Sequence, residues 1–303
     1  MNYLKLIRLP NLLIIALTQY LIRYTIIIPI LTVYGLTSSL SEINLFLIVL
    51  STILIAAGGY VINDYHDQQI DLINKPERVI IGKTVSKKQG VIFYAALSAT
   101  GIAIGIYLSF VHNVPLIWQI NFISAALLWL YSSMLKKIFL IGNVLISLLS
   151  SLSLLIIFIS EKIIQTNEVK EIKYLIVAYS IFGFIMTWIR EVIKDLEDKE
   201  GDLIFDRKTL PIVAGEVFSK WFAVLLIFVV LYSLMFIQYK QQQWHDKISF
   251  AYVIAGIELP LIVLFVLLLR ANTKKQYTVS SRLTKVIMVT GILSMLVFYL
   301  RYK

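Results

Sequence analysis

Two groups of three aspartates carry the same spacing, Asp-x-x-Asp-x-x-x-Asp. The six residues are Asp64, Asp67, Asp71, Asp195, Asp198 and Asp202. Side chains three and four residues apart share one face of an α-helix, so the spacing predicts that each group lies on one helix face. Adjacent carboxylates repel one another unless a cation is near, and Mg²⁺ prefers oxygen ligands and binds substrate phosphates. The repeat therefore predicts two facing acidic groups that hold a diphosphate through Mg²⁺.

The acidic residues are concentrated in the two segments that contain these groups. Of the 18 aspartates and glutamates, 12 fall within residues 62–88 and 190–217. A solvated charged loop is the ordinary explanation for one acidic segment. It does not explain why the same spacing recurs in both segments, so we interpret the two segments as parts of one site.

Basic residues flank both groups and could neutralise phosphate oxygens that a metal leaves uncovered. These candidate diphosphate-binding residues are Lys75, Arg78, Lys83, Arg190 and Lys194. The alternative explanation for any one of them is topology, because cytoplasmic loops of membrane proteins are enriched in lysine and arginine.

The composition indicates an integral membrane protein. The chain has 303 residues, of which 59% are hydrophobic and 15% are charged, with a mean hydropathy of +0.82. A soluble domain would not expose so much apolar surface. Nine apolar segments have the length that a bilayer requires. They are 11–33, 43–62, 89–110, 114–134, 138–160, 173–193, 218–239, 248–269 and 284–301. We expect an all-α protein with one polytopic domain over residues 1–303.

The basic residues predict the orientation. With the N-terminus in the cytoplasm, cytoplasmic segments carry 20 of the 28 lysines and arginines. This asymmetry follows the positive-inside rule and places both aspartate groups at the cytoplasmic face of the cell membrane. The net charge of +10 is scattered over loops and does not form a basic stripe with interleaved aromatics. We therefore attribute it to topology and anionic lipids and expect no nucleic-acid partner.

Other chemistries find little support. The chain has no cysteine, and His66, His112 and His245 are scattered, so a catalytic triad is not indicated. We interpret His66 as a solvated position between the aspartates, because Mg²⁺ prefers oxygen. No phosphate-binding glycine loop is present, and Gly101-x-x-x-Gly105 favours a close helix contact in the bilayer.

The main rival class is a transporter, whose polar site lies near the membrane midplane. Only Arg23 and Glu258 lie deep within predicted spans. We expect these two side chains to face the cavity, and each other, or to form a structural ion pair. Because the acidic residues gather at one aqueous face, the distribution favours an enzyme. A membrane phosphotransferase is also disfavoured, since its Asp-Gly-x-x-Ala-Arg pattern is absent.

The motif Asn63-Asp64-x-x-Asp67-x-x-x-Asp71 after the second span, with the second aspartate motif after the sixth, resembles the UbiA superfamily of intramembrane prenyltransferases. Arg8-Leu-Pro10-Asn11 before the first span agrees with this resemblance. The resemblance implies a ring of nine helices, built from two pseudo-repeated parts, around a central cavity capped by the motif segments. The sequence of the second motif most resembles that of the branch that prenylates geranylgeranylglyceryl phosphate in ether-lipid synthesis.

The resemblance also implies roles for individual residues. Residues matching the motifs would hold two Mg²⁺ ions on the diphosphate, and these are Asn63, Asp67, Asp71, Asp195, Asp198 and Asp202. Asp64 joins the metal-binding candidates at a position that the family fills less uniformly. Tyr131 and a following lysine would approach the diphosphate, but the gap leaves both Lys136 and Lys137 open.

The expected reaction is Mg²⁺-dependent ionisation of a prenyl diphosphate, which we expect to be geranylgeranyl diphosphate, followed by attack of an acceptor on the allylic carbocation. The apolar chamber would exclude water. An anionic prenylglyceryl phosphate acceptor requires extra polar groups, for which the candidates are Asn11, Lys137, Arg207 and Lys208, with Lys136 as a further cation. The alternative acceptor is an aromatic ring, such as a quinone or haem precursor.

Overall fold

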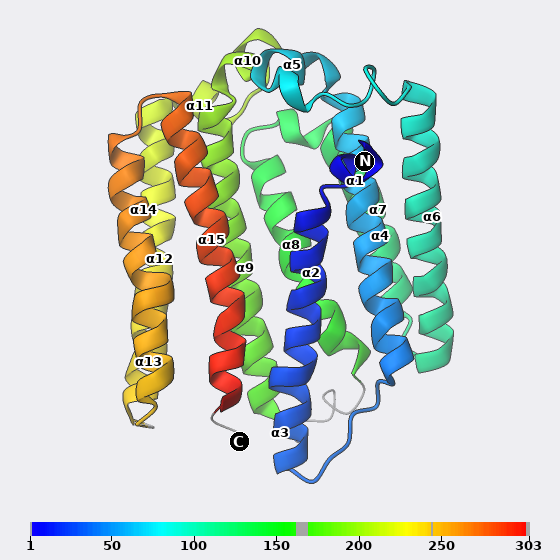
Figure 1. Ribbon diagram of the computed structural model, residues 1–303, viewed down its shortest axis with the longest axis vertical. Helices are drawn as coiled ribbons and strands as arrows, with labels where there is room; N and C mark the ends of the chain where they lie inside the picture. The colour runs from blue at the N-terminus through cyan, green and yellow to red at the C-terminus, as the bar shows by residue number, and fades with distance from the viewer. Residues whose placement is uncertain (1, 162–168, 244, 301–303) are drawn as a thin grey trace.

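The computed structural model describes residues 2–161, 169–243 and 245–300, and this part of the chain is almost entirely helical. It contains nine helices that are long and apolar enough to cross a membrane, as the sequence predicts. These helices run side by side along the long axis of the molecule (Figure 1). They are α2–η1–α3 (Leu9–Leu21, Ile22–Ile27 and Ile28–Val33), α4 (Glu42–His66), α6 (Lys87–His112), α7 (Leu116–Ser133), α8 (Ile141–Ser160), α9 (Lys170–Glu197), α12 (Glu216–Gln243), α13–η5–α14 (Lys247–Val253, Ile254–Glu258 and Leu259–Arg270) and α15 (Lys274–Tyr299).

Short helical segments cap one end of this bundle and connect the spans. They are α1 (Asn2–Leu6), α5 (Gln68–Asn74), η2 (Pro76–Arg78), η3 (Leu135–Lys137), α10 (Lys199–Ile204) and α11 (Leu210–Val213). Both aspartate motifs lie at this end, which is uppermost in Figure 1 and which we call the motif end. The described C-terminal residues lie at the opposite end.

Helix starts are set by capping as well as by hydropathy, which explains the largest boundary error. The last span was predicted from residue 284, whereas α15 begins at Lys274. Thr273 and Gln276 form a capping box there, and a similar box of Ser86 and Gln89 starts α6. Hydropathy marks only the apolar part of such a helix. Residue 301, the end of the predicted span, lies outside the described residues.

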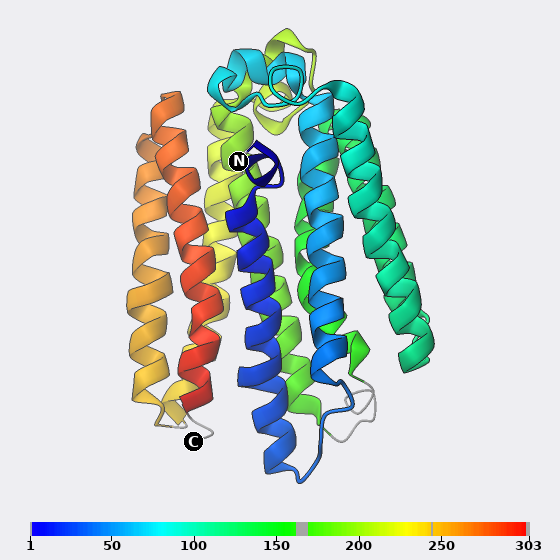
Figure 2. The same ribbon diagram turned by 45° about the vertical axis from the view of Figure 1, so that its right-hand side comes forward.

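The spans form a ring around a largely apolar cavity of about 330 Å³, which we call the inner chamber. The elements that line it are α2, α4, α7, α8, α9 and α15. Helix α6 packs outside against α4 and α7, while α12 and α14 pack outside against α9 and α15 (Figure 2). Outer helices present large apolar side chains to the surroundings, such as Phe110 (82% exposed) and Tyr232 (77%). This is the pattern of a bundle in lipid.

The small residues of α6 permit the close helix contact that their spacing predicts. A Cβ atom added to Gly101 would lie 2.7 Å from Ile55 Cγ1 and 3.1 Å from the Ser51 carbonyl oxygen. Asn121 Nδ2 of α7 donates a hydrogen bond to the Gly101 carbonyl oxygen (3.3 Å). Glycine therefore lets α6 approach both α4 and α7.

Each aspartate motif bends around a corner, so the expectation of three carboxylates on one helix face is wrong. Helix α4 ends at His66, Asp67 forms the corner, and α5 continues across the motif end with Asp71. The second motif repeats this arrangement, with Asp198 at the corner between α9 and α10. Gly201 consequently lies inside α10. The corners turn α5 and α10 toward each other, which straight helices could not do.

The two deep charges are not arranged as expected. Arg23 and Glu258 line neither cavity of the described structure, and Arg23 instead pairs with Glu161. The Arg23 Nη1 to Glu161 Oε2 distance is 2.6 Å, and the two side chains are 3% and 0% exposed. Oε1 of Glu258 is buried without a hydrogen-bond partner. The structural alternative therefore holds for Arg23, with a partner that the predicted spans do not contain.

Candidate active site

A polar cavity of about 1010 Å³ lies between the motif-bearing segments, and we call it the outer cavity. Eight acidic and nine basic side chains line it, so it suits an anion held together with cations. Most residues predicted from the sequence line this cavity. They are Asn11, Asn63, Asp64, Asp67, Asp71, Lys75, Arg78, Tyr131, Lys136, Arg190, Lys194, Asp195, Asp198, Asp202 and Arg207.

Asp67 is the most heavily contacted of the aspartates. Its carboxylate accepts from Lys136 Nζ (2.7 Å) and Asn63 Nδ2 (2.9 Å), and it also pairs with Arg207. Burial would raise the pKa of Asp67, but the charges of Lys136 and Arg207 outweigh it and hold that pKa below its ordinary value. Asp67 is therefore an ionised carboxylate in a cationic surrounding.

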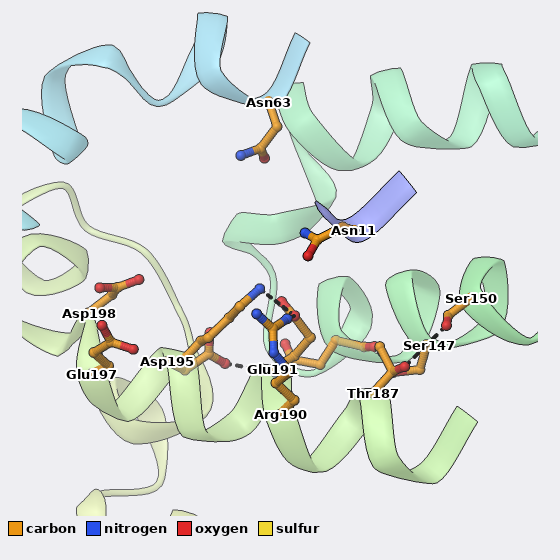
Figure 3. A network of polar contacts seen from close by, with 12 residues as sticks. Asn11, Asn63, Ser147, Ser150, Thr187, Arg190, Glu191, Asp195, Glu197 and Asp198 are labelled. Carbon is orange, nitrogen blue, oxygen red and sulfur yellow. Dashed lines mark hydrogen bonds and ion pairs between the residues drawn. The ribbon is translucent and has the colours of Figure 1, made fainter. Parts of the chain in front are cut away.

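The second motif is held in a similar way, partly by residues of the first. Lys75 Nζ lies 2.7 Å from the Asp198 carboxylate and 3.4 Å from Glu197 Oε1. Asn143 Nδ2 of α8 donates to Asp195 Oδ2 (2.8 Å). Figure 3 shows Asp195 and Asp198 on the α9 side of the space, across from Asn63. The two motifs thus face each other over one cavity.

Arg207 joins the motifs directly, because it pairs with Asp67 and lies 3.6 Å from Asp202 Oδ1. The side chain of Asn74 also binds the backbone of the second motif. Asn74 Oδ1 of α5 accepts from the Gly201 amide (3.1 Å), and Asn74 Nδ2 donates to the Asp198 carbonyl oxygen (3.2 Å). The distance between the motifs is therefore fixed by specific contacts between α5 and α10.

Two of the motif aspartates, Asp71 and Asp202, have raised pKa values. Burial, followed by the charges of Asp67 and Asp64, raises the pKa of Asp71 to about 6. Burial also raises the pKa of Asp202 to about 6, with Asp198 adding to the rise and Arg207 opposing it. A bound dication would favour the ionised form of both groups.

The donor set has the chemistry of a magnesium site without its final geometry. Carboxylates and the Asn63 amide supply only hard oxygen ligands, as Mg²⁺ requires. Across residues 2–161, 169–243 and 245–300, however, no three acidic, histidine or cysteine side chains converge closely enough to bind a metal as they stand. The carboxylates do not converge because lysine and arginine side chains form ion pairs with Asp67 and Asp198. The residues fit the ion, provided that these ion pairs exchange.

The structure separates the predicted cations into two sets. Of the two lysines left open, Lys136 contacts the first motif, whereas Lys137 is exposed. Lys83, Lys137 and Lys208 are described by the structure but line neither cavity. The Lys208 amide donates to the Lys137 carbonyl oxygen (3.0 Å), so these two residues connect loops. Asp64, the less uniform motif position, pairs with Arg8 (2.8 Å).

A protein-family model identifies the family of the chain. Residues 26–286 match the model of the UbiA prenyltransferase family. The chain belongs to the UbiA prenyltransferase family. It is therefore an intramembrane prenyltransferase, and the nine apolar helices make it a multi-pass membrane protein.

Individual members of the UbiA family resemble the chain over most of its length. The digeranylgeranylglyceryl phosphate synthase of Sulfurisphaera tokodaii is 33% identical over 232 residues, which are 75% of this chain and 76% of the relative. The synthase of the same name from Sulfolobus acidocaldarius is 31% identical over 241 residues, 80% of each chain.

Two solved structures show the UbiA fold of the whole chain. One concerns digeranylgeranylglyceryl phosphate synthase, with a TM-score of 0.66, 24% identity and coverage of 99% of this chain and 98% of the other. The other is a UbiA homologue from Archaeoglobus fulgidus bound to GPP and Mg²⁺, with a TM-score of 0.60, 14% identity and coverage of 97% and 99%. The predicted ring of nine helices around a cavity is thereby confirmed.

Sequence reasoning missed several residues of this candidate site. Arg8, Glu191 and Lys285 line both the outer cavity and the inner chamber, and Asn143 contacts the second motif. Arg8 stands in the Arg8-Leu-Pro10-Asn11 pattern that resembles the family, so a signal was present for it. Lys285 contacts Asn11, which lies 274 positions earlier, and no local pattern announces such a contact.

Proposed function

We propose that this chain transfers a geranylgeranyl group from its diphosphate to the hydroxyl of a prenylglyceryl phosphate and so forms an ether lipid. The observation that carries the proposal is the outer cavity, in which two aspartate motifs and their cations meet and which shares its inner lining with an apolar chamber. Relatives named digeranylgeranylglyceryl phosphate synthase support the choice of acceptor. They favour it over the aromatic ring that the sequence left open.

The donor diphosphate would lie in the outer cavity with Mg²⁺. The UbiA homologue from Archaeoglobus fulgidus was solved with GPP and Mg²⁺, which supports this assignment. The residues that would hold two ions are Asn63, Asp67, Asp71, Asp195, Asp198 and Asp202, with Asp64 at the edge of the set. When bound, Mg²⁺ neutralises charge that develops on the departing diphosphate.

The side chains of the outer cavity promote the first step. Lys75, Lys136 and Arg207 pair with motif carboxylates, and these three cations would bind the phosphate oxygens when those carboxylates hold Mg²⁺. They stabilise the diphosphate as the bond between its oxygen and prenyl C1 breaks. Tyr131 lines the junction of the two cavities, where its ring can face the allylic cation.

The inner chamber serves the second step. Its apolar lining keeps water from the allylic cation, so the acceptor hydroxyl oxygen forms the new bond to C1. The hydroxyl proton passes to the released diphosphate, which is a base generated in the same cavity. The products are a prenyl ether and a protonated diphosphate, and no covalent enzyme intermediate is required.

The test is transfer of labelled geranylgeranyl diphosphate by the purified protein, with Mg²⁺ and with EDTA. Geranylgeranylglyceryl phosphate and 4-hydroxybenzoate are offered together as competing acceptors. We expect Mg²⁺-dependent label on the glycerophosphate, reduced about 100-fold or more by Asp67→Asn or Asp198→Asn, since each removes charge from the diphosphate site. Glu200→Gln, an exposed residue of the same region, is the matched control.

The other outcomes are informative. Label on the aromatic ring would replace the acceptor while keeping prenyl transfer. Label on the glycerophosphate in EDTA would exclude the metal-assisted mechanism. If neither acceptor is labelled and no diphosphate is released, the proposed donor is wrong.

A further inference from the structure

Four cations line both the outer cavity and the inner chamber. Arg8 pairs with the motif aspartate Asp64. The other three are Arg190 and Lys194 of α9 and Lys285 of α15, and none of these three pairs with a motif aspartate in the described structure. None of the six motif aspartates lines the inner chamber. These cations therefore lie deeper than the carboxylates that would hold the metals, on the side from which the prenyl chains must be reached.

These cations differ from those of the outer cavity in their partners. Lys75, Lys136 and Arg207 each pair with a motif aspartate. By contrast, Arg190 and Lys194 share the single carboxylate Glu191, which lies 2.6 Å from Lys194 Nζ, and Lys285 contacts the neutral Asn11. Because Arg8 is neutralised by Asp64, these three positive charges against one negative charge leave the junction with an excess of two positive charges.

The geometry of the junction also leaves donors unused. Arg190 Nη1 lies 3.4 Å from Glu191 Oε1, a long contact, and its buried Nε has no hydrogen-bond partner in the described structure. Lys285 Nζ donates to a neutral group, Asn11 Oδ1 (2.6 Å). Figure 3 shows Arg190 and Glu191 projecting from α9 into the space below Asn11 and Asn63. A buried guanidinium N–H without an acceptor is costly unless a ligand supplies one.

We propose that Arg190, Lys194 and Lys285 bind the phosphate monoester of the acceptor, at a subsite separate from the donor diphosphate. This inference rests on the proposed function, because it assigns a place to one of its two substrates. A phosphate monoester carries about −1.5 to −2 charges at neutral pH and offers three acceptor oxygens, which matches the excess charge of the junction. The guanidinium fork of Arg190 suits two of those oxygens.

The position of the junction fits the reaction. In a prenylglyceryl phosphate, the free hydroxyl is at most two carbons from the carbon that bears the phosphate. The phosphate must therefore lie close to prenyl C1 of the donor, while the acceptor's own prenyl chain needs an apolar space. Lys194 precedes Asp195 of the second motif, and all three cations border the inner chamber, so both conditions are met. Asn11, a predicted acceptor-binding residue, contacts Lys285 and so belongs to this subsite. Lys137 and Lys208, which were also predicted to bind the acceptor, line neither cavity.

The rival assignment is that these cations bind the donor diphosphate, as the sequence suggested for Arg190 and Lys194. The two assignments differ in which KM changes. We expect Lys285→Gln and Arg190→Gln each to raise the KM for geranylgeranylglyceryl phosphate about tenfold or more, as loss of a charged hydrogen bond implies. The KM for geranylgeranyl diphosphate should stay within about twofold of the wild-type value. Arg282→Gln, an exposed position on the same helix, is the matched control.

An uncharged acceptor isolates the phosphate. Geranylgeranylglycerol, which lacks it, should be used equally poorly by the wild type and by both variants. Binding of geranylgeranylglyceryl phosphate to metal-free protein, measured by calorimetry, gives a readout independent of activity. We expect the Kd to rise about tenfold or more in Lys285→Gln and Arg190→Gln and to be unchanged in Arg282→Gln.

The outcomes separate this inference from the proposed function. If the wild type labels the glycerophosphate but the variants change only the donor KM, the subsite is wrong and the function stands. If the wild type binds the glycerophosphate through these residues but transfers nothing to it, the subsite stands and the function falls. Absence of both binding and transfer would overturn both.

Discussion

At the scale of single residues, the site is organised by ion pairs that cross from one motif to the other. Lys75 follows the first motif but contacts Asp198, and Arg207 follows the second but contacts Asp67. From the sequence, the aspartates are predicted to bind metal and the lysines and arginines to bind phosphate. In the structure, the two kinds of residue form ion pairs with each other. Opposite charges at this distance favour the charged form of both partners. Loading of Mg²⁺ and diphosphate must therefore exchange these pairs.

The raised pKa values of Asp71 and Asp202 predict a pH-dependent response to Mg²⁺. Burial lifts both from 3.8 to about 6, so the folded protein retains protons that the unfolded chain releases. The metal-free protein should thus lose stability as the pH rises from about 4 to about 6. Mg²⁺ binds only ionised carboxylates, so its stabilising shift in Tm should be larger at pH 7 than at pH 5.

Thermal unfolding at the two pH values, with and without Mg²⁺, measures this difference. Asp71→Asn removes one titrating group and should reduce the dependence on pH. Equal shifts at pH 5 and pH 7 in the wild type would show that neither group takes part in binding the metal.

At the scale of elements, the close crossing of α5 and α10 sets the spacing of the two motifs. A Cβ atom on Gly201 would lie 2.5 Å from Asn74 Nδ2, so alanine must either displace the Asn74 side chain and break its hydrogen bonds to the second motif or push α10 away from α5. Because displacement of catalytic groups by about 1 Å can cost about 10²-fold, we expect Gly201→Ala to lower prenyl transfer by about that factor. Helical circular dichroism should stay unchanged, and more Mg²⁺ should be needed for half-maximal activity.

Gly256→Ala in η5 is the matched control, because a Cβ there meets only the Tyr252 ring at 3.4 Å. Its activity and Mg²⁺ dependence should equal those of the wild type. Wild-type Mg²⁺ dependence in Gly201→Ala would mean that the crossing does not control the site.

The elements also show what a sequence can and cannot predict. The length of an apolar segment depends only on local composition, so hydropathy alone was enough to predict the nine spans. The corner at Asp67 was missed, because helical spacing continues through it and only the docking of α5 reveals the bend. Partners distant in sequence, such as Lys285 and Asn11, depend on how the ring closes. That the two halves repeat one another stays a prediction.

At the scale of the whole molecule, a buried ion pair connects the first and fifth spans at the end opposite the motifs. Arg23 Nη1 contacts Glu161 Oε2, and Glu161 Oε1 accepts from Ser39. Removing one partner leaves an uncompensated buried charge, so Glu161→Gln should destabilise the protein by about 3–5 kcal/mol. Combined replacement of both residues by methionine should recover most of that loss. Equilibrium unfolding in mixed micelles measures both effects.

The distance of this pair from the motifs supplies the control. Mg²⁺ dependence of prenyl transfer should be unchanged in Glu161→Gln at a temperature where it remains folded. If the double methionine variant is less stable than Glu161→Gln, the pair contributes more than its own desolvation cost, and this account of it is wrong.

The charge asymmetry of the whole molecule predicts that the motif end faces the cytoplasm. Segments at that end carry 20 of the 28 lysines and arginines, and the chain contains no cysteine, so single cysteines can be added without background. Glu200→Cys at the motif end should react with a membrane-impermeant maleimide only after the cells are permeabilised. Gln243→Cys, exposed at the opposite end of α12, should react in intact cells, and the unmodified chain should stay unlabelled. The reverse pattern would place the aspartates outside the cell and separate them from a cytoplasmic supply of diphosphate and Mg²⁺.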